Sequence, residues 1–500
     1  MLLFSLKSAK VRAGFPAFRE RLAAAGFSQD TLAATLNLNH PAESPDVAVL
    51  LRKTEEPTPY NIFFRLFVLG VTVDMIAARE AFKPKVFELL AEARLLVPHN
   101  EDGEDLNGIQ AAVKLVPYEG YYCASDFSVR ERGGAALAGN FVPGVSPASV
   151  TLANFTIRNP VESTFDLGTG IGIHAMLAAR HSGRVVGSDL NERALEFARL
   201  NAALNGLDNI EWVTGSFFEP VAGRRFDLVV ANPPFVISPR SRYLYRDGGL
   251  SGDGVSEHVA RGVVEHLNEG GYAVMLANWF YKEDEEWDTR PRRWLDANGC
   301  DAWLIRSADA EPITYAANWL KQTEAGDPER YARMLGEWLE YYESEGIHRL
   351  CSGALILRKR GGGANWVRSD TMHAVMGTRP SGDHVHRIFQ AEDYLSALPS
   401  DEALYDVLLQ CHPDVTVNQI LEPDGAEWAA KRITLGCGRG LPFGGDGDGW
   451  LLQFLMRLNG TATMRCVLEK LQSETGDTQE FASYLAVVKK LIRSGMVVPV

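Results

Sequence analysis

Residues 166–173 read DLGTGIGI, and the organisation of the central part of the chain can be worked out from this stretch. The apolar run Thr164–Leu167 leads into it and is typical of a buried strand, and glycines follow at positions 168, 170 and 172. Glycine is needed where a ligand comes so close to the backbone that a Cβ atom would block it. Glycine turns also close strand–helix corners for structural reasons alone. The stretch therefore predicts a strand, a tight turn and a helix, and other motifs must show whether a ligand binds.

The spacing of the glycines distinguishes between two kinds of nucleotide site. A dinucleotide-binding turn would have its third glycine at position 173, where this chain has Ile173. The next strand-like run ends in GSDLN (187–191), which places Asp189 23 residues after Asp166. A carboxylate there can hold two ribose hydroxyls, and the alternative for an Asp at a strand end is a helix cap. The spacing disfavours a dinucleotide and makes Asp189 a candidate ribose ligand.

Strand-like and helical patterns alternate through the middle of the chain. The strand-like runs are Thr164–Leu167, Arg184–Asp189, Ile210–Thr214, Phe226–Ala231, Tyr272–Ala277, Asp301–Ile305 and Ala354–Leu357. The clearest helical pattern runs from Asn191, a candidate cap, to Leu204, with Gly206 placed to end it. Such alternation requires crossover connections and a mainly parallel sheet. We therefore expect a Rossmann-like, doubly wound α/β domain with seven strands over residues 136–365.

The two flanking regions differ from the centre and resemble each other. Residues 60–98 and 450–500 both show apolar helices, a glycine turn and a closing apolar strand. We expect a helical, winged-helix-like N-terminal domain over 1–135 and a winged-helix-like C-terminal domain over 366–500. Such modules dock on nucleic acid, or they serve packing and dimerisation. Residues 381–500 carry 16 acidic and 10 basic side chains, which disfavours phosphate contact in the C-terminal module.

The composition of the 500 residues narrows the class of protein. Hydrophobic residues make up 46% and charged residues 23%, as in soluble globular proteins. The net charge of −14 argues against broad, nonspecific clamping of duplex nucleic acid, but a local basic patch is compatible with it. The six cysteines are scattered, and the N-terminal apolar run is too short for a signal peptide. We therefore expect a cytoplasmic protein with reduced thiols, no metal and no membrane contact.

A second informative motif, ANPPFV (231–236), follows the fourth strand-like run. Pro233 and Pro234 cannot donate to a sheet ladder, so they end the strand and fix the direction of the backbone. A rigid turn explains the prolines but not the amide of Asn232 before them or the ring of Phe235 after them. These four residues are candidate catalytic residues at the carboxyl end of the sheet, where ligands bind in open α/β folds.

Taken together, the glycine turn, Asp189 and ANPPFV resemble the class I S-adenosylmethionine-dependent methyltransferases. More narrowly, they resemble the small-domain group, which includes release-factor glutamine and ribosomal RNA guanine N-methyltransferases. The resemblance covers residues 140–280 well, residues 280–360 loosely and the flanks hardly at all. It implies that residues 136–365 are a catalytic domain and that S-adenosyl-L-methionine is the cofactor.

The resemblance also implies where the cofactor lies. The glycine turn would line its methionine end, with Asp166 orienting the amino group, and Asp189 would bind the ribose. Ser216 and Phe217 would flank the adenine, although Ser216 stands where the family usually has an Asp. The segment FVPGVSPASVTLANF (141–155) would lie as a turn and helix over the methionine end, and Ser149 and Thr151 in it are further candidates. The implied cofactor contacts are Asp166, Gly168, Thr169, Gly170, Gly172, Asp189, Leu190, Ser216, Phe217 and Asn232.

The NPPF motif suits the methylation of a planar nitrogen. The lone pair of an aromatic amine or a carboxamide is delocalised, so the nitrogen must pyramidalise before it attacks a methyl group in line. The side-chain carbonyl of Asn232 and the backbone carbonyl of Pro233 can accept its two N–H bonds and stabilise the developing positive charge. Phe235 can stack on the planar group. Methylation acidifies the nitrogen, so water can take the proton and no strong base is needed.

Arginines and tyrosines interleave in the loop after the motif, SPRSRYLYRDGG (238–249). One interpretation is a mobile substrate-gripping loop, with cations for phosphate and rings for a base. The other is a solvated loop with an internal ion pair to Asp247. The candidate substrate-binding residues are Arg240, Arg242, Tyr243, Tyr245 and Arg246.

These observations predict an N-methyltransferase that acts on a planar amino group of a macromolecule. The first expectation is an RNA base, such as one in ribosomal RNA, because of the loop and the winged-helix-like flanks. The close alternative is a glutamine amide of a translation factor, and a small-molecule N-methyltransferase is a further one. A cofactor-binding scaffold without catalysis would have no use for the amine clamp at Asn232. The sequence leaves the oligomeric state open.

Overall fold

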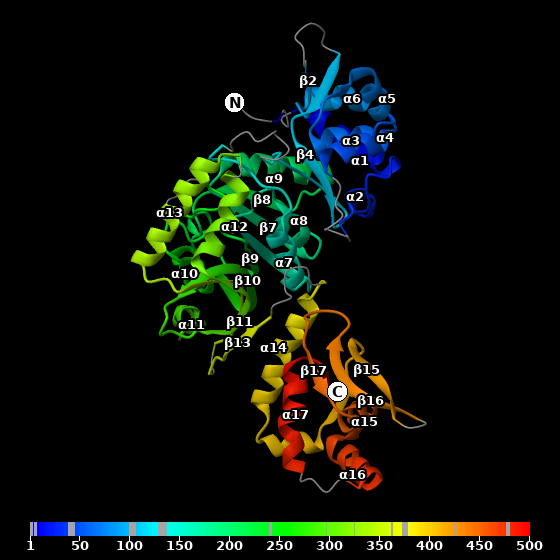
Figure 1. The fold of residues 1–500 in the computed structure, drawn as a ribbon, viewed down its shortest axis with the longest axis vertical. Helices are drawn as coiled ribbons and strands as arrows, with labels where there is room; N and C mark the ends of the chain where they lie inside the picture. Colours follow the sequence, from blue (N-terminus) through cyan, green and yellow to red (C-terminus); the bar gives the residue numbers. More distant parts are fainter. Residues whose placement is uncertain are drawn as a thin grey trace. The chain divides into compact units, whose positions relative to one another are not determined.

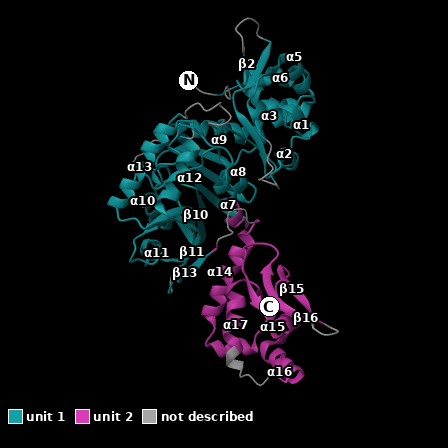
Figure 2. Ribbon diagram, in the orientation of Figure 1, with its two compact units in different colours: residues 1–152, 160–371 teal, residues 153–159, 372–500 magenta. Residues whose placement is uncertain are grey.

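The computed structural model describes residues 4, 8–38, 46–99, 107–128, 138–239, 243–296, 298–324, 326–361, 364–372, 379–424, 427–476 and 481–500 (Figure 1). The chain forms two compact units (Figure 2). The first comprises Met1–Leu152 and Pro160–Thr371, and the second comprises Ala153–Asn159 and Met372–Val500. The N-terminal region therefore belongs to the same unit as the central sheet. The boundaries expected after residues 135 and 365 stay predictions.

An eight-stranded sheet forms the centre of the first unit, in the order β13-β11-β12-β10-β9-β6-β7-β8. Its strands are β6 (Val161–Leu167), β7 (Ser182–Asp189), β8 (Ile210–Thr214), β9 (Phe226–Ala231), β10 (Leu267–Tyr281), β11 (Cys300–Ala310), β12 (Arg349–Lys359) and β13 (Val367–Thr371). Neighbouring strands are parallel, except that β12 runs antiparallel to β10 and β11. All seven expected strands lie within β6 to β12, which confirms the doubly wound α/β fold, and β13 adds an eighth strand at one edge.

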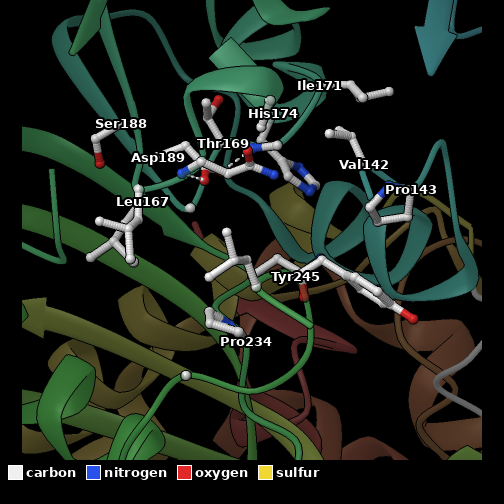
Figure 3. Close-up of a pocket in the computed structure, with 18 of the residues that line it drawn as sticks. Val142, Pro143, Leu167, Thr169, Ile171, His174, Ser188, Asp189, Pro234 and Tyr245 are labelled. Atoms are coloured by element: carbon white, nitrogen blue, oxygen red, sulfur yellow. Dashed lines mark hydrogen bonds between the residues drawn. The ribbon is translucent and has the colours of Figure 1, made fainter. Parts of the chain in front are cut away.

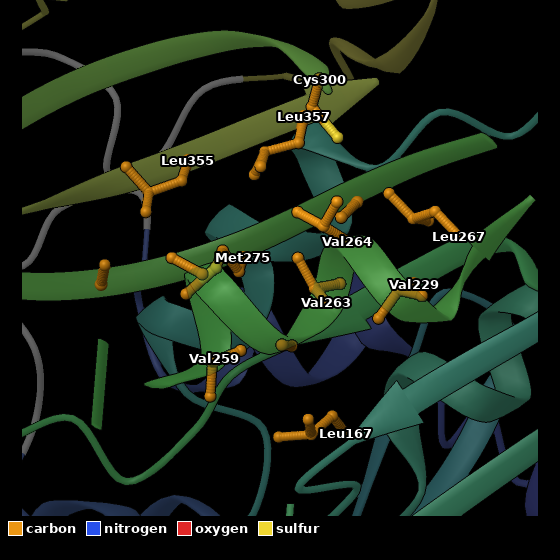
Figure 4. Close-up of a cluster of buried hydrophobic side chains, with 14 of the residues drawn as sticks. Leu167, Val229, Val259, Val263, Val264, Leu267, Met275, Cys300, Leu355 and Leu357 are labelled. Carbon is orange, nitrogen blue, oxygen red and sulfur yellow. The ribbon is translucent and has the colours of Figure 1, made fainter. Parts of the chain in front are cut away.

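Helices cover both faces of this sheet. Val185 of β7 packs with residues of α8 (Ile173–Ala178). The next residue, Val186, packs in a larger cluster that includes residues of α10 (Gly254–Gly262) and α11 (Thr289–Leu295). In that cluster, Val259 and neighbouring side chains meet residues of β9, β10 and β12 (Figure 4). Successive strand residues point to opposite faces, so α8 lies on one side of the sheet and α10 and α11 on the other.

Helix α9 (Glu192–Asn205) connects β7 with β8 and begins beside the candidate ribose ligand. The side chain of Asn191 accepts a hydrogen bond from the amide of Arg193 and caps the start of the helix. Gly206, at φ +73°, ends it in the left-handed conformation that favours glycine. Both ends therefore lie where the cap residues predict them.

The N-terminal part of the first unit consists of small elements that precede the sheet. They are α1 (Ala9–Ala24), α2 (Gln29–Thr35), α3 (Val47–Lys53), α4 (Pro59–Phe64), α5 (Met75–Phe82), α6 (Pro84–Glu92), the antiparallel sheet of β1 (Val73–Asp74), β3 (Gly108–Ala111) and β2 (Leu96–His99), and the hairpin of β4 (Lys114–Tyr118) and β5 (Tyr121–Ser125). The side chain of Asn201 in α9 exchanges two hydrogen bonds with the backbone of Ala124, at 2.7 and 3.0 Å. The side-chain amide of Asn201 thus supplies one acceptor and one donor to the hairpin backbone, as the backbone of a neighbouring strand would. The winged-helix-like interpretation of this part stays a prediction.

The second unit has its own core. It contains α14 (Gly382–Ala397), the sheet of β18 (Asn459–Thr463), β14 (Leu408–Cys411) and β19 (Val497–Pro499), the sheet of β15 (Val415–Asp424), β16 (Glu427–Cys437) and β17 (Gly444–Gly447), and helices α15 (Gly449–Arg457), α16 (Met464–Thr475) and α17 (Phe481–Arg493). Phe454, Leu468 and Val488 are fully buried where α15, α16 and α17 meet. Its winged-helix-like character also stays a prediction. None of the helices in the described ranges has the length and apolar character needed to cross a membrane.

The side chain of Asn201 generates a stability prediction. It is fully buried, and its amide also donates to the carbonyl of Ile171 at 2.9 Å, so Asn201→Ala breaks three buried hydrogen bonds. We expect the free energy of unfolding of the first unit to fall by about 2–4 kcal/mol in a urea titration followed by tryptophan fluorescence. The exposed Asn318 in α12 (Pro312–Glu324) is the matched control. A loss in Asn318→Ala as large as that in Asn201→Ala would contradict this role.

Candidate active site

A cavity of about 300 Å³ opens at the carboxyl ends of β6, β7, β8 and β9. Leu167, Ser188 and Asp189 line it from the ends of β6 and β7, and Pro234 lines it from the motif after β9 (Figure 3). The carboxyl ends of parallel strands are where open α/β sheets bind their ligands. The glycine turn and the NPPF motif, which are 60 residues apart in the chain, therefore face one cavity.

Glycine is needed at the positions of the turn for different physical reasons. Gly168, Gly170 and Gly172 have φ values of +71°, +54° and +85°, which L side chains rarely adopt. A Cβ atom at Gly170 would have no atom within 4 Å, whereas one at Gly172 would lie 2.8 Å from the ring of Trp212. Gly168 and Gly170 line the cavity, and Gly172 does not. Gly170 leaves room for a ligand, and Gly172 leaves room for packing.

Asp166 supports the turn from within the protein and is fully buried. Its Oδ2 accepts hydrogen bonds from the hydroxyl of Thr169 and, at 2.9 Å, from the amide of Ala175. Oδ1 is buried and accepts no hydrogen bond within the described ranges. Burial raises the pKa of this carboxyl group to about 7, because a carboxylate without water is costly. Thr169, and not Asp166, is among the residues that line the cavity.

Asp189 joins the turn to the second strand. Its Oδ2 accepts a hydrogen bond from the amide of Gly170 at 2.9 Å, and its Oδ1 accepts one from the amide of Asn191 at 2.8 Å. Desolvation raises the pKa of this carboxyl group, and the bonds from the backbone amides oppose that rise. The amide of Leu190 also stabilises this carboxylate, and a carboxylate oxygen can accept more than one hydrogen bond, so hydroxyl donors in the cavity can still bind to it. The geometry is that of a carboxylate held in place for a polar ligand.

Ser216, Phe217 and Leu190 line the other end of the cavity. Phe217 has φ +46°, a conformation that bulky residues adopt only where their surroundings hold them. Its ring centroid lies 4.5 Å from that of His258 on α10. The side chain of Leu190 is 59% exposed and forms part of the cavity rim. The residues expected to flank the adenine, Ser216 and Phe217, thus line the cavity, and the adenine contacts themselves stay a prediction.

The NPPF motif is divided between the cavity and the interior. Asn232 and Pro234 line the cavity, whereas Pro233 is buried and Phe235 is half-buried outside the lining. The carbonyl of Pro233 accepts the amide of Phe235 at 2.8 Å, which uses one of its two lone pairs. The structure thus brings the amide of Asn232 to the glycine turn but does not bring the ring of Phe235 to the cavity.

The five candidate residues of the following loop have different locations. Arg240 and Arg242 lie outside the described residues. Tyr245 lines the cavity, and its ring lies 5.5 Å from that of Phe141 (Figure 3). Tyr243 is buried. The side chain of Arg246 is only 1% exposed and pairs with Asp247 at 2.8 Å, which is the internal ion pair of the alternative interpretation. Arg246 is therefore placed to hold the loop, not to reach a phosphate.

The segment 141–155, which was expected to lie over the methionine end of the cofactor, forms a wall of the cavity before and at the start of α7 (Pro147–Phe155). Phe141, Val142, Pro143 and Ser146 line the cavity together with the expected Ser149, whereas the hydroxyl of Thr151 bonds within its helix to the carbonyl of Pro147. His174 in α8 and Leu244 also line the cavity. Leu244 donates its amide to the carbonyl of Gly139 at 3.1 Å, so the two loops meet. His174 directly follows the glycine turn, and that position was the only signal for it.

Comparison with known proteins identifies the domain. Residues 144–286 match the methyltransferase small domain family. Over 167 residues the chain is 34% identical to a ribosomal protein uL3 glutamine methyltransferase of Bradyrhizobium diazoefficiens, with 30% of this chain and 52% of that protein covered. It is 32% identical over 129 residues to a release factor glutamine methyltransferase of Xylella fastidiosa, with 23% and 46% covered. It is 34% identical over 117 residues to a ribosomal RNA small subunit methyltransferase C of Escherichia coli, with 23% and 31% covered.

The chain thus spans about half, or less, of the length of these relatives. The matched residues contain the glycine turn, Asp189 and the NPPF motif. The match confirms the resemblance to S-adenosylmethionine-dependent methyltransferases of the small-domain group for this part of the chain.

Asp189 generates a prediction about ligand affinity. Asp189→Ala removes a fixed carboxylate from the cavity and should weaken the binding of S-adenosylmethionine by about 2–3 kcal/mol, measured by calorimetry. Asp227, which bonds to Ser163 and Asn268 and does not line the cavity, is the control carboxylate of the same sheet. Asp227→Ala should leave the affinity unchanged. Unchanged affinity in Asp189→Ala would remove this residue from the site.

Proposed function

We propose that the chain, whose residues 144–286 match the methyltransferase small domain, transfers a methyl group from S-adenosylmethionine to a planar nitrogen of a macromolecule. One observation carries the proposal. Asn232, at the end of β9, lines the same cavity as Gly170 and Asp189. An amide carbonyl that can accept N–H bonds therefore faces a site suited to a nucleoside with a charged tail.

The residues present fit this cofactor. Open space faces Gly170, so a ligand can approach the turn without meeting a side chain. Asp189 would hold the ribose hydroxyls through its remaining lone pairs, and Ser216, Phe217 and Leu190 would flank the base. Asp166 would act through the turn that it supports, because it does not itself line the cavity. S-adenosylmethionine supplies, when bound, a methyl group on a positively charged sulfur.

Asn232 and Pro233 would prepare the acceptor nitrogen. The side-chain carbonyl of Asn232 accepts one N–H bond of the substrate and stabilises positive charge on the nitrogen as its lone pair forms the new C–N bond. Pro233 is buried and does not line the cavity, so its carbonyl, which already accepts the amide of Phe235, would reach the other N–H bond only after a shift of the turn on substrate binding. The proton that the nitrogen must lose then passes to water. The chain therefore needs to orient the nitrogen but not to supply a strong base.

The cavity rim favours a carboxamide of a protein as the substrate. The cavity-lining residues of the described ranges include no Lys or Arg, and Leu190 and Leu244 at the rim are 59% and 45% exposed. A rim that is apolar, with no cation among its described residues, suits the side chain of a glutamine better than a phosphate backbone. The uL3 and release-factor relatives carry the name of glutamine methyltransferases. We therefore place a glutamine amide of a protein first.

An RNA base is the second candidate, and the aromatic ring of Tyr245 at the cavity favours it. Flat bases stack on aromatic side chains when they are splayed out of a single strand. One relative is named as a ribosomal RNA methyltransferase, which also supports an RNA base as the substrate. A base, like a carboxamide, presents a planar nitrogen to Asn232, so the chemistry of the clamp does not separate the two.

Labelled cofactor separates the two substrates. The full chain is incubated with methyl-labelled S-adenosylmethionine and a fractionated lysate, and the products are treated with RNase or with protease. We expect the label to survive RNase and to be lost with protease. Loss of the label with RNase alone would move the assignment to an RNA base. Label in neither macromolecular fraction would overturn the proposed function.

Asn232 provides the sharpest test of the chemistry. Its carbonyl contact strengthens as charge develops on the nitrogen, so Asn232→Ala should lower turnover by about a hundredfold or more with little change in cofactor affinity. Asn232→Asp keeps the shape and the acceptor and adds a negative charge, so it should retain partial activity and bind the cofactor more tightly. Full activity in Asn232→Ala would end the amine-clamp account.

A further inference from the structure

The chain directly after the NPPF motif forms a loop with a closed neck. Phe235 pairs with Asp247 in an isolated β-bridge, and the amide of Val236 donates to the carbonyl of Arg246 at 3.2 Å. The residues between these pairs include Leu244 and Tyr245, which line the cavity. The position of the neck therefore determines where two cavity residues and the end of the motif lie.

Two tyrosines from a distant part of the chain hold this neck. The hydroxyl of Tyr342 donates to the carbonyl of Ile237 at 2.8 Å, and the amide of Ile237 donates to the hydroxyl of Tyr315 at 3.2 Å. Ile237 is fully buried, so its backbone groups need such partners. Asn278 of β10 donates to the same hydroxyl of Tyr315 at 2.6 Å. The hydroxyl of Tyr315 therefore connects Ile237 at the neck with Asn278 of the central sheet.

Both tyrosines belong to a helical insertion between β11 and β12. Tyr315 lies in α12 and Tyr342 in α13 (Pro328–Ser344). Val236 and Ile237 pack in one cluster with Trp338 and both tyrosines. Burial raises the pKa of Tyr315 to about 12 and raises that of Tyr342 well above its usual value. Both hydroxyls therefore keep their protons at neutral pH, and Tyr342 can always donate.

The same insertion holds the other strand of the neck. The guanidinium of Arg246 lies 5.3 Å from the ring centroid of Trp338 and pairs with Asp247. The hydroxyl of Tyr243 donates to Glu324 at 3.3 Å, and Glu324 pairs with Arg330 at 2.7 Å. Helices α12 and α13 therefore contact both sides of the loop, although neither helix lines the cavity.

We propose that Tyr315 and Tyr342 are positioning residues, which fix the NPPF turn and the loop after it relative to the cofactor cavity. This role rests on the proposed methyl transfer. Ile237 is five residues from Asn232, and the two prolines between them transmit its position with little freedom. A misplaced acceptor nitrogen lowers the rate of methyl transfer. It does not weaken the binding of S-adenosylmethionine, because the glycine turn and Asp189 are held by other elements.

The first test compares two neighbouring tyrosines of α13. Tyr342→Phe keeps the ring and removes only the bond to Ile237, whereas Tyr341→Phe removes a bond from the amide of Gly252 at 2.9 Å. We expect Tyr342→Phe to lower kcat by about ten- to a hundredfold with an unchanged Kd for S-adenosylmethionine. Tyr341→Phe should lose a similar amount of thermal stability and keep kcat. Equal effects of the two variants on kcat would overturn the proposal.

The second test does not depend on turnover. Hydrogen exchange of the Ile237 amide, followed by mass spectrometry, should be at least about tenfold faster in Tyr315→Phe than in Tyr341→Phe, because its acceptor is removed. Unchanged exchange would overturn the proposal, since the neck would then be held by other contacts. A wild-type chain that transfers no methyl group would instead count against the proposed function, and the exchange result would still decide whether the tyrosines hold the neck.

Discussion

Asp166 holds the glycine turn by hydrogen bonds to the hydroxyl of Thr169 and the amide of Ala175, and it does so without contact with solvent. A carboxyl group in that place is costly, and its pKa of about 7 reflects the cost. Without it, the amide of Ala175 in the first turn of α8 and the buried hydroxyl of Thr169 would lose a partner, which costs free energy as well. The turn can therefore present open backbone to a ligand only because a buried side chain fixes it from behind.

The two sides of the cavity are held in different ways. The cofactor side is local, because Asp166, Thr169 and Asp189 lie within one strand–turn–helix–strand unit and bond to its own backbone. The acceptor side is not local, because the chain after Asn232 is held by side chains about 80 and 100 residues further on.

The local part of this structure could be predicted from the sequence, and the non-local part could not. Apolar runs and cap residues such as Asn191 and Gly206 encode the strands and α9 directly, because they act over a few residues. Strand β13, with the sequence VRSDT, lacks an apolar run and was missed because pairing with β11 alone makes it a strand. Arg246 has the sequence surroundings of a solvated residue, but the ring of the distant Trp338, together with that of Tyr243, covers its guanidinium. The different roles of Gly170 and Gly172 likewise depend on Trp212, which the turn itself does not specify.

Helix α9 connects the N-terminal region to the cavity by a series of bonds along one side. Near its end, Asn205 exchanges hydrogen bonds with the backbone of Tyr122, and Asn201 does the same with Ala124. Nearer its start, Arg193 pairs with Asp126, which also accepts the amide of Val142 at 3.0 Å. Val142 lines the cavity.

From the end of α9 towards its start, the residues bonded to the helix are Tyr122, Ala124 and Asp126, and Asp126 in turn bonds to Val142. A helix of 14 residues rises by about 21 Å, so this series carries the chain from the N-terminal hairpin to the cavity wall. The segment that forms the wall is therefore bonded to the same helix whose cap, Asn191, donates its amide to Asp189. The N-terminal hairpin and the cavity residue Val142 are therefore both joined to α9 by hydrogen bonds and an ion pair, Val142 through Asp126 and Arg193.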